Sequence, residues 1–327
     1  MDRRDKSAVS GRSPIALTIA GSDSGGGAGI QADLKTFAAL GVYGASAITA
    51  LTAQNTLGVS AIHLAPSEIV AAQIEAVLED FDVAAVKIGM LGSAEIAEAV
   101  AGSLGTPPSP LAGEGPGVRG RRASAVGQRA LRRDPSSGAA RHLLKANAEH
   151  SSAPQGGTGR APFVVYDPVL AASSGDALAG AGFLEAIKAR LLPLIDCLTP
   201  NLSEAAALLG APLATSEAEM ARQGEALLKL GPRAVLMKGG HLEGAEAVDL
   251  LVTPVSVRRF AAPRLVSRNL HGTGCTLSSA IAAHVVLGAP LGDAVAEAKD
   301  FVRRAIEYGR DVTLGAGAGP LLQTPIR

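Results

Sequence analysis

Short apolar runs alternate with segments of helical spacing along most of this chain. The apolar run Ile15–Ala20 precedes a segment in which Ile30, Leu34 and Phe37 recur at helical intervals, and this order is then repeated. Strands that alternate with helices favour one mainly parallel sheet with helices on both faces. The sequence therefore predicts an α/β fold.

The periodicity also places the individual strands. Lys87 lies inside one apolar run, and we expect it at an edge of the sheet with its amine reaching solvent. Strands are expected at 15–20, 42–51, 59–64, 84–89, 163–166, 194–198 and 234–237, a hairpin at 248–252 with 255–260, and closing helices at 276–287 and 291–308.

The loops that follow these strands are polar or rich in glycine. In open α/β sheets, ligands bind outside the carboxyl ends of the strands. The first loop has neither the complete dinucleotide fingerprint nor the Gly-Lys-Ser/Thr of a P-loop. We expect a binding site among the loops Gly21–Gly29, Thr52–Thr56, Asp167–Gly175, Thr199–Glu204 and Lys238–His241.

A second glycine-containing stretch, Leu270–Ser279, leads into an apolar helix. Gly272 and Gly274 allow the backbone to approach a ligand closely. The unpaired N–H groups and the positive dipole end of a helix N-terminus bind phosphate well. At this position the pKa of the Cys275 thiol is expected to fall, so that its thiolate acts as a base or nucleophile. An ordinary turn with an inert, buried cysteine is the alternative.

Composition excludes several classes of protein. The chain has 327 residues, of which 47% are hydrophobic, and its 30 basic side chains balance 30 acidic ones. It can therefore bury a large core and has no net charge to attract nucleic acid or an anionic membrane. Cys197 and Cys275 suit neither a disulfide framework nor a metal cluster. The absence of a signal peptide or membrane-spanning pattern favours a cytoplasmic protein.

The stretch Thr106–Pro162 interrupts the alternation. It is rich in Pro, Gly, Ser and Arg, and only 139–148 suggests even a transient helix. We expect a flexible N-terminus at 1–13 and one domain at 14–327, with a disordered basic insertion at about 106–161. A nucleic-acid-binding arm is the alternative, and the absence of aromatic side chains between the arginines disfavours it.

Together the loops contain the groups that phosphoryl transfer needs. That reaction requires a phosphate-binding site, Mg²⁺ and a base for the attacking hydroxyl group. The stretch 272–279 with Lys238 provides the first, and acidic side chains in the loops are able to hold Mg²⁺ through water. His241 and His271 are further basic candidates. The sequence has no Ser–His–Asp arrangement around a nucleophile elbow.

Seven short blocks, taken in order, carry a resemblance to a known family: Ala20–Thr36, Ala50–Thr56, Lys87–Leu91, Asp167–Val169, Thr199–Ala205, Met237–His241 and His271–Thr276. The chain resembles the hydroxymethylpyrimidine/phosphomethylpyrimidine kinases of thiamine biosynthesis, in the ribokinase-like superfamily. The resemblance implies a ribokinase-like fold. It also implies ATP-dependent phosphorylation of 4-amino-5-hydroxymethyl-2-methylpyrimidine to its monophosphate and then to its diphosphate.

The resemblance implies a substrate site. Gln54 would hydrogen-bond the aminopyrimidine, whose donor and acceptor edge matches an amide. Asp33 would lie beside the same ring, and Gly21 and Met90 would line its pocket. For Gln54, a loop-capping amide is the alternative.

A phosphate and metal site is implied as well. Lys238 and Thr273 would contact the ATP phosphates together with Asn201. Asn201 and Glu204 would act near Mg²⁺, through water. A solvated lysine at a strand end and simple helix capping by Glu204 are the alternatives.

The resemblance finally suggests the catalytic groups. Gly272, Gly274 and the following N–H groups would form the anion hole. Cys275 stands where the wider superfamily has an Asp that takes the substrate proton, and we expect Cys275 to be the base. A homodimer is expected from the family alone.

Three other functions remain as alternatives. A pyridoxal or pyridoxine kinase has the same fold and also acts on a hydroxymethyl heteroaromatic, but Gln54 favours the pyrimidine. A non-catalytic pyrimidine-binding regulator would keep the pocket without turnover, which the presence of both Lys238 and Cys275 disfavours. A nucleic-acid-binding protein would show strongly salt-dependent affinity.

Overall fold

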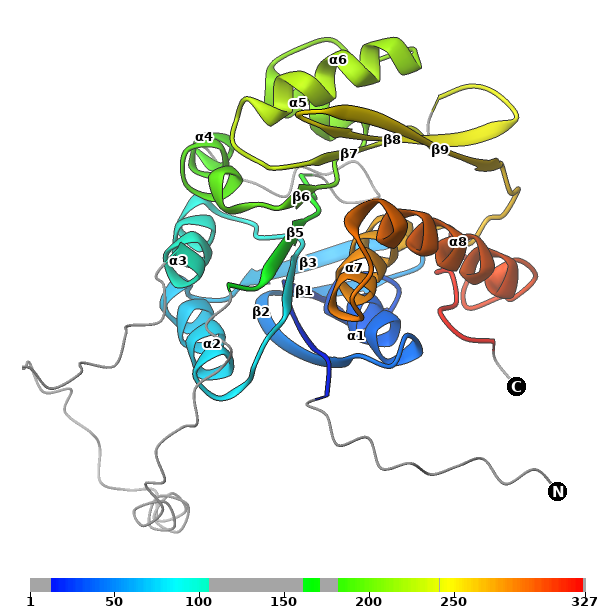
Figure 1. Ribbon diagram of the computed structural model, residues 1–327. Coiled ribbons are helices and arrows are strands. Elements are labelled where there is room, and N and C mark those ends of the chain that lie inside the picture. The colour runs from blue at the N-terminus through cyan, green and yellow to red at the C-terminus, as the bar shows by residue number, and fades with distance from the viewer. Residues whose placement is uncertain (1–12, 106–160, 171–181, 241, 326–327) are drawn as a thin grey trace, which may run out of the picture. The chain divides into compact units, whose positions relative to one another are not determined.

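The computed structural model describes residues 13–105, 161–170, 182–240 and 242–325 (Figure 1). Their strands form one nine-stranded sheet in the order β3-β2-β1-β4-β5-β6-β7-β8-β9. Neighbours from β2 to β7 are parallel, as predicted, and β3, β8 and β9 pair antiparallel. The strands are β1 (Ile15–Asp23), β2 (Tyr43–Asn55), β3 (Gly58–Leu64), β4 (Ala85–Ile88), β5 (Phe163–Tyr166), β6 (Cys197–Leu198), β7 (Val235–Lys238), β8 (Glu246–Thr253) and β9 (Ser256–Pro263).

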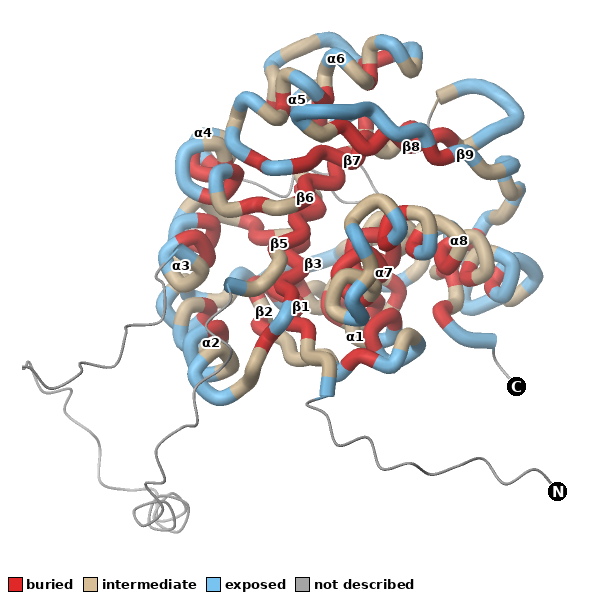
Figure 2. Tube along the Cα trace, viewed as in Figure 1, coloured by how far each residue is buried: buried red, intermediate tan, exposed pale blue. Residues whose placement is uncertain are grey.

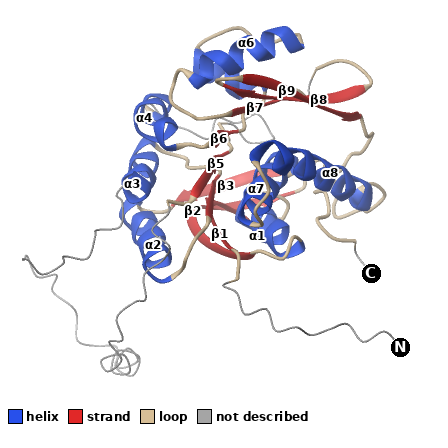
Figure 3. Ribbon diagram, viewed as in Figure 1, coloured by secondary structure: helices blue, strands red, loops and turns tan. Residues whose placement is uncertain are grey.

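Helices cover both faces of the sheet, as predicted (Figures 1 and 3). α1, α7 and α8 pack on one face, and α2, α3, α5 and α6 pack on the other. A π-helical turn (η1, Ile187–Leu191) and a 3-10 turn (η2, Leu192–Leu194) follow α4. The helices are α1 (Gly29–Ala39), α2 (Ser67–Asp80), α3 (Ala94–Gly105), α4 (Phe183–Ala186), α5 (Leu202–Leu209), α6 (Glu217–Leu228), α7 (Thr273–Val286) and α8 (Leu291–Gly309).

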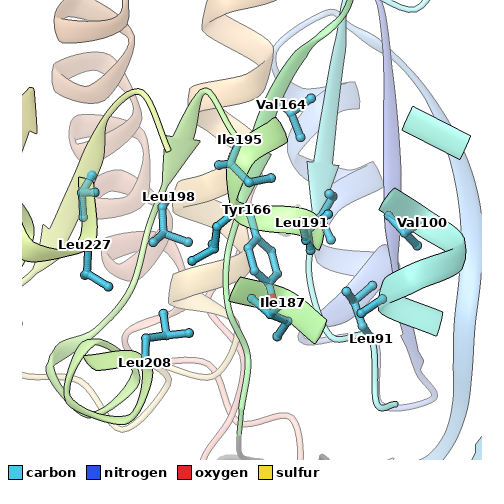
Figure 4. Packing of buried hydrophobic residues seen from close by; sticks show 14 of the residues in the cluster. Leu91, Val100, Val164, Tyr166, Ile187, Leu191, Ile195, Leu198, Leu208 and Leu227 are labelled. Carbon is cyan, nitrogen blue, oxygen red and sulfur yellow. The ribbon is translucent and has the colours of Figure 1, made fainter. Parts of the chain in front are cut away.

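Residues of the central strands alternate between two apolar cores. In β1, Ala16 faces the α1 and α7 side, whereas Leu17 faces the α2 and α3 side. The buried residues run along the middle of the molecule (Figure 2). Figure 4 shows the larger core, in which Tyr166 of β5 lies near Ile187 and Leu191. At about 25 cal/mol per Å² of buried apolar surface, such cores are the main stabilising contribution and hold the strand ends in place.

Three elements differ from the sequence-based boundaries. β2 continues to Asn55, because Gln54 pairs with Val59 of β3; the predicted loop at 52–56 is therefore mostly an edge hairpin. α7 begins at Thr273, three residues before the predicted start, because Gly272 caps it in the left-handed conformation. The predicted strand 194–198 is only Cys197–Leu198, because η2 extends to residue 194.

Lys87 is placed differently from the prediction. Its strand, β4, lies between β1 and β5 in the interior of the sheet. The side chain is fully buried, and its ammonium lies 2.8 Å from an Asp33 carboxylate oxygen. The expectation that Lys87 lies at an edge and reaches solvent was wrong, since a charge in a strand covered on both faces must find a buried partner.

Several predictions fall outside the described residues. They are the N-terminal segment, most of the basic insertion, the loop after Leu170 and His241. In the described part of the chain, every helix is too short or too polar to cross a membrane.

Candidate active site

A pocket of about 670 Å³ lies at the carboxyl ends of the parallel strands. Its wall combines residues that follow β1, β4, β5, β6 and β7 with the β2–β3 hairpin and the first turn of α7. The structure thus brings together segments that are far apart in the sequence. All but one of the predicted site residues line this pocket: Gly21, Gln54, Met90, Asn201, Glu204, Lys238, Gly272, Thr273, Gly274 and Cys275.

The glycine loop after β1 is organised by Asp23. Asp23 Oδ1 accepts the N–H of Gly25 at 2.8 Å, and Oδ2 accepts those of Gly27 and Ala28 at 3.0 and 2.8 Å. Burial raises the pKa of Asp23, but the hydrogen bonds from His271 and these backbone groups outweigh it, so the pKa lies below its usual value. A permanent carboxylate therefore folds the loop over the strand end.

Gln54 and His271 meet at one wall of the pocket. Gln54 Nε2 lies 3.1 Å from His271 Nε2, and the same ring nitrogen lies 3.2 Å from Asp23 Oδ2. Because a carboxylate only accepts, this nitrogen of His271 carries a proton. The nitrogen and oxygen of the Gln54 amide therefore exchange places, an assignment that the hydrogen-bond partners decide. The amide oxygen then accepts from His271, and the amide NH₂ donates to Thr52 Oγ1 over 3.2 Å. Among the described residues, one amide N–H and one oxygen lone pair of Gln54 then have no further partner.

Gly21 and Met90 form a small apolar part of the wall. A Cβ at Gly21 would lie 2.7 Å from the terminal methyl group of Met90, so the two residues are in close contact. A flat ring passing over Gly21 would therefore meet the Met90 side chain. Both residues line the pocket, and their contact with a pyrimidine ring stays a prediction.

The N-terminus of α7 closes the opposite wall. Gly272, with a φ of +85°, approaches Gly27 so closely that a Cβ would lie 1.9 Å from the Gly27 carbonyl oxygen. Thr276 N donates to Gly272 O at 2.9 Å. The N–H groups of Gly274 and Cys275 have no partner among the described residues, as expected in a first helical turn. This end of α7 is therefore able to bind an anion.

Lys238 projects from the end of β7 into the pocket. Its Nζ lies 2.5 Å from Asp167 Oδ1 and 3.7 Å from Glu204 Oε2. Burial lowers the pKa of Lys238, but these two carboxylates outweigh burial and raise it above its usual value. The ammonium is thus permanently charged and held beside the α7 N-terminus.

Asn201 and Glu204 form a capping box at the start of α5. Asn201 Oδ1 accepts Glu204 N at 2.9 Å, and Glu204 Oε2 accepts Asn201 N at 2.6 Å. The helix-capping role is confirmed, and both residues also line the pocket. Burial raises the pKa of Glu204 to about 7, although Lys238 opposes this shift.

Cys275 lies in the first turn of α7, half-buried at the pocket wall. The predicted fall in its pKa was wrong. Burial raises the pKa of the thiol to about 11; the charge of Lys87 opposes the rise, and Asp33 and Asp167 add to it. The advantage of a helix N-terminus is smaller here than the cost of removing a thiolate from water.

Asp33 is the predicted site residue that does not line the pocket. Its side chain is fully buried between α1, β1, β4 and α7. Lys87 Nζ lies 2.9 and 2.8 Å from its two oxygens, and Thr18 and Ser279 each donate a hydroxyl at 2.6 Å. The predicted substrate contact of Asp33 is therefore corrected, because its acceptor positions are already occupied behind the wall.

Sequence reasoning missed two acids and undervalued one histidine. Asp23 and Asp167 follow the apolar runs of β1 and β5, and acidic residues at the carboxyl ends of parallel strands are a signal for a site. His271, which the sequence offers only as a further basic candidate, contacts both Asp23 and Gln54. In the described residues there is no group of three or more His, Cys, Asp and Glu that would hold a metal directly.

Solved structures of kinases share this fold. The chain aligns with phosphomethylpyrimidine kinase from Clostridium difficile at 38% identity and a TM-score of 0.65, covering 89% of this chain and 99% of that one. It aligns with an ADP complex of Bacillus subtilis pyridoxal kinase at 27% identity and a TM-score of 0.72, covering 96% and 98%. The fold is that of the ribokinase-like kinases.

Sequence comparison then narrows the class. The family model for phosphomethylpyrimidine kinase matches residues 23–110 and 153–322, and the chain belongs to this family. It is also similar to the hydroxymethylpyrimidine/phosphomethylpyrimidine kinase of Rhizobium meliloti, with 47% identity over 94% of this chain and 96% of that protein. The gap between the two matched ranges lies within the basic insertion at about 106–161.

Proposed function

We propose that this protein transfers the γ-phosphoryl group of ATP to 4-amino-5-hydroxymethyl-2-methylpyrimidine and then phosphorylates the monophosphate again, in thiamine biosynthesis. Family membership supports a kinase of this pathway. The observation that carries the proposal is that one pocket is lined by both an amide side chain and a helix N-terminus; the amide suits an aminopyrimidine, and the helix N-terminus suits a phosphate. These are Gln54 and the first turn of α7, with Lys238 between the neighbouring carboxylates.

In this proposal Gln54 orients the substrate. Its uncommitted N–H and oxygen lone pair complement a ring nitrogen and the adjacent amino group of an aminopyrimidine. Gly21 lets the Met90 side chain pack against the backbone, since a Cβ there would lie 2.7 Å from the Met90 methyl group, and the ring would bind against the surface that these two residues form. The ring's hydroxymethyl group would then point toward Cys275.

The phosphates would bind at the opposite wall. The free N–H groups of Gly274 and Cys275 would contact the transferring phosphate, and Lys238 would neutralise its charge. Thr273 and Asn201 line the same region. Asp167, Asn201 and Glu204 line this part of the pocket and would hold Mg²⁺ through water, because Asn201 Oδ1 and Glu204 Oε2 already accept backbone N–H groups. When bound, Mg²⁺ would neutralise phosphate charge.

We further propose Cys275 as the base. Its thiolate would take the proton of the hydroxymethyl group while that oxygen attacks the γ-phosphorus and the bond to ADP breaks. Because burial raises the pKa of the Cys275 thiol in the folded protein to about 11, the thiolate is a minor form at neutral pH. The rate should therefore rise with pH. A cytoplasmic location and a homodimeric state, with no nucleic-acid partner, are proposed by analogy with the family.

The test measures ATP-dependent product formation from hydroxymethylpyrimidine, its monophosphate and pyridoxal in parallel, with mono- and diphosphate separated by chromatography. Turnover of both pyrimidines with poor use of pyridoxal is expected. The similarity to pyridoxal kinase makes pyridoxal the informative competitor. Preference for pyridoxal would overturn the role of Gln54, and binding of pyrimidine without turnover would make the protein a binding module.

A further inference from the structure

The proposed mechanism leaves one buried ion pair without a task. Lys87 and Asp33 are both fully buried, and their side chains lie 2.8 Å apart behind the pocket wall. Burying two charges is costly even when they are paired, and a pair of apolar residues would usually serve stability as well. A buried pair next to an active site is therefore a candidate for a functional role.

The fold builds this pair from four elements. Thr18 of β1 and Lys87 of β4 are register partners, so both side chains point to the α1 and α7 face of the sheet. Asp33 of α1 receives the ammonium on both oxygens, the Thr18 hydroxyl on one and the Ser279 hydroxyl on the other. The carboxylate is fully satisfied, and the pair is held in one position.

Gly89 provides the space for the ammonium. It is two residues after Lys87 and points to the same face of the sheet. A Cβ at Gly89 would lie 2.9 Å from Lys87 Nζ and 3.0 Å from the Cβ of Ala20. Any larger residue would displace the charge.

The pair is connected directly to the helix that carries Cys275. Ser279, which donates to Asp33 at 2.6 Å, lies four residues after Cys275, so both side chains lie on the same face of α7. The charged groups that act on the thiol are Lys87 from β4, Asp33 from α1 and Asp167 after β5, and the thiol in turn acts on Lys238 of β7. Of these, Lys87 has the strongest effect that favours the thiolate.

We propose that Lys87 and Asp33 are positioning residues of the active site: through Ser279 the pair anchors α7 one turn after Cys275, and its ammonium favours the thiolate form of Cys275. Asp33 keeps Lys87 charged in a fully buried position, and the Lys87 ammonium acts on the Cys275 thiol more strongly than the Asp33 carboxylate does. This inference rests on the proposed role of Cys275 as the base.

The test follows thiolate formation without turnover. In a Cys197→Ala background, Cys275 is the only remaining cysteine, and its alkylation by iodoacetamide is measured between pH 7 and 10. Lys87→Met should slow alkylation at pH 8.5 by about ten-fold, the equivalent of one pKa unit. Lys299→Met is the matched control, since Lys299 forms a largely buried ion pair with Asp249 at 2.6 Å and does not line the pocket. It should leave the alkylation rate unchanged.

The direction of the effect separates the two roles. A variant that merely loosens the site exposes the thiol and speeds alkylation, whereas loss of the ammonium slows it. Because Lys87→Met leaves a buried carboxylate unpaired, Lys87→Met/Asp33→Asn is measured as well, with thermal unfolding as the check on folding. Slower alkylation in both folded variants supports the proposal; unchanged or faster alkylation overturns it. If Cys275→Ala kept full kcat while alkylation slowed as expected, the base assignment would fail and the electrostatic link would stand.

Discussion

The Lys238 ammonium lies 2.5 Å from Asp167 Oδ1. Lys238 ends β7 and Asp167 follows β5, and these two strands flank β6 in the sheet. A Cβ on Gly274 would lie 3.3 Å from both Lys238 Nζ and Asp167 Oδ2. The pair therefore stands directly against the α7 N-terminus. Lys238 is positioned for phosphate before any ligand binds, so little reorganisation is required.

Replacing this lysine should impair catalysis, and thermal unfolding checks that the variant folds, since it leaves the buried Asp167 carboxylate without its ammonium partner. Lys238→Met removes a charge-assisted contact to phosphate, for which a loss of about 2–3 kcal/mol, or roughly 30- to 150-fold in kcat/KM, is expected. Steady-state kinetics with varied ATP measure it. Lys299→Met is the control, because it removes another largely buried lysine. An equal loss of kcat/KM in both variants would contradict a specific role for Lys238.

Loss of the Cys275 thiol should affect the chemical step. Cys275→Ala should lower kcat by about 10²–10⁴-fold with little change in KM, the usual range for general base catalysis. The measurement is single-turnover phosphorylation of hydroxymethylpyrimidine. An alanine variant that keeps most of the wild-type kcat would rule out Cys275 as the base.

The pH dependence tests the same residue differently. The pKa of the thiol is about 11, so the thiolate fraction grows about ten-fold for each pH unit below that value. We expect log kcat to rise with pH from 7 to 9 in the wild type, and Cys275→Ala should lose this slope. A flat wild-type profile would indicate another proton acceptor.

The backbone contact under α7 predicts a stability difference. Gly272→Ala should cost about 1–2 kcal/mol for the left-handed conformation, plus the clash with the Gly27 carbonyl. Gly288→Ala is the matched control: its φ is +95°, yet no atom lies within 4 Å of the added Cβ. Chemical denaturation should show a larger loss for Gly272→Ala, and equal losses would contradict the close contact.

Glu204 predicts a stability change with pH. Burial raises its pKa from 4.5 to about 7, so between these values the folded protein holds a proton that the unfolded chain has released. This group therefore makes the free energy of unfolding fall as pH rises from about 4.5 to 7. Glu204→Gln removes the effect, and the variant should gain stability relative to the wild type over that interval. Parallel curves for both proteins would contradict the raised pKa.

The basic segment is predicted to be dispensable for the chemistry. α3 ends at Gly105 and β5 begins at Phe163, and neither residue lines the pocket. Deleting residues 107–159 leaves a short connection, and loop-closure cost changes only slowly with length. We expect kcat/KM within about three-fold of the full chain. Lost activity in a deletion variant with an unchanged unfolding transition would assign the segment a role at the site.

Much of the fold could be predicted because the strands are apolar runs bounded by glycine and polar residues. The hairpin β2–β3 was partly missed because its polar residues, including Gln54, pair at a sheet edge, where polar side chains do not reveal a strand. The short strand β6 was overestimated because Leu194 and Ile195 are apolar in either conformation. The local sequence pattern does not distinguish a polar edge strand from a loop, or a short apolar strand from a 3-10 turn.

Two charged residues near the site, Asp33 and Lys87, were also placed wrongly from the sequence. Asp33 shares a motif with pocket residues, so resemblance placed it beside the substrate. Its spacing held the better signal: Ile30, Asp33 and Phe37 fall on one helical face, and that face is buried. Lys87 within a wholly apolar strand required a buried partner. The two misplaced charges belong together, which only the packing of α1 against the sheet reveals.

The contact between Gly27 and Gly272 also bears on how the protein acquires its activity. These residues are separated by most of the chain, yet a single added carbon at Gly272 would overlap the Gly27 carbonyl oxygen. Closing so long a loop costs conformational entropy, which the contacts of the intervening strands and helices must offset. A chain emerging from the ribosome presents Gly27 long before Gly272, so it has no anion hole until α7 has been made and has docked. Competence for phosphoryl transfer would appear in one step, as the last helices pack.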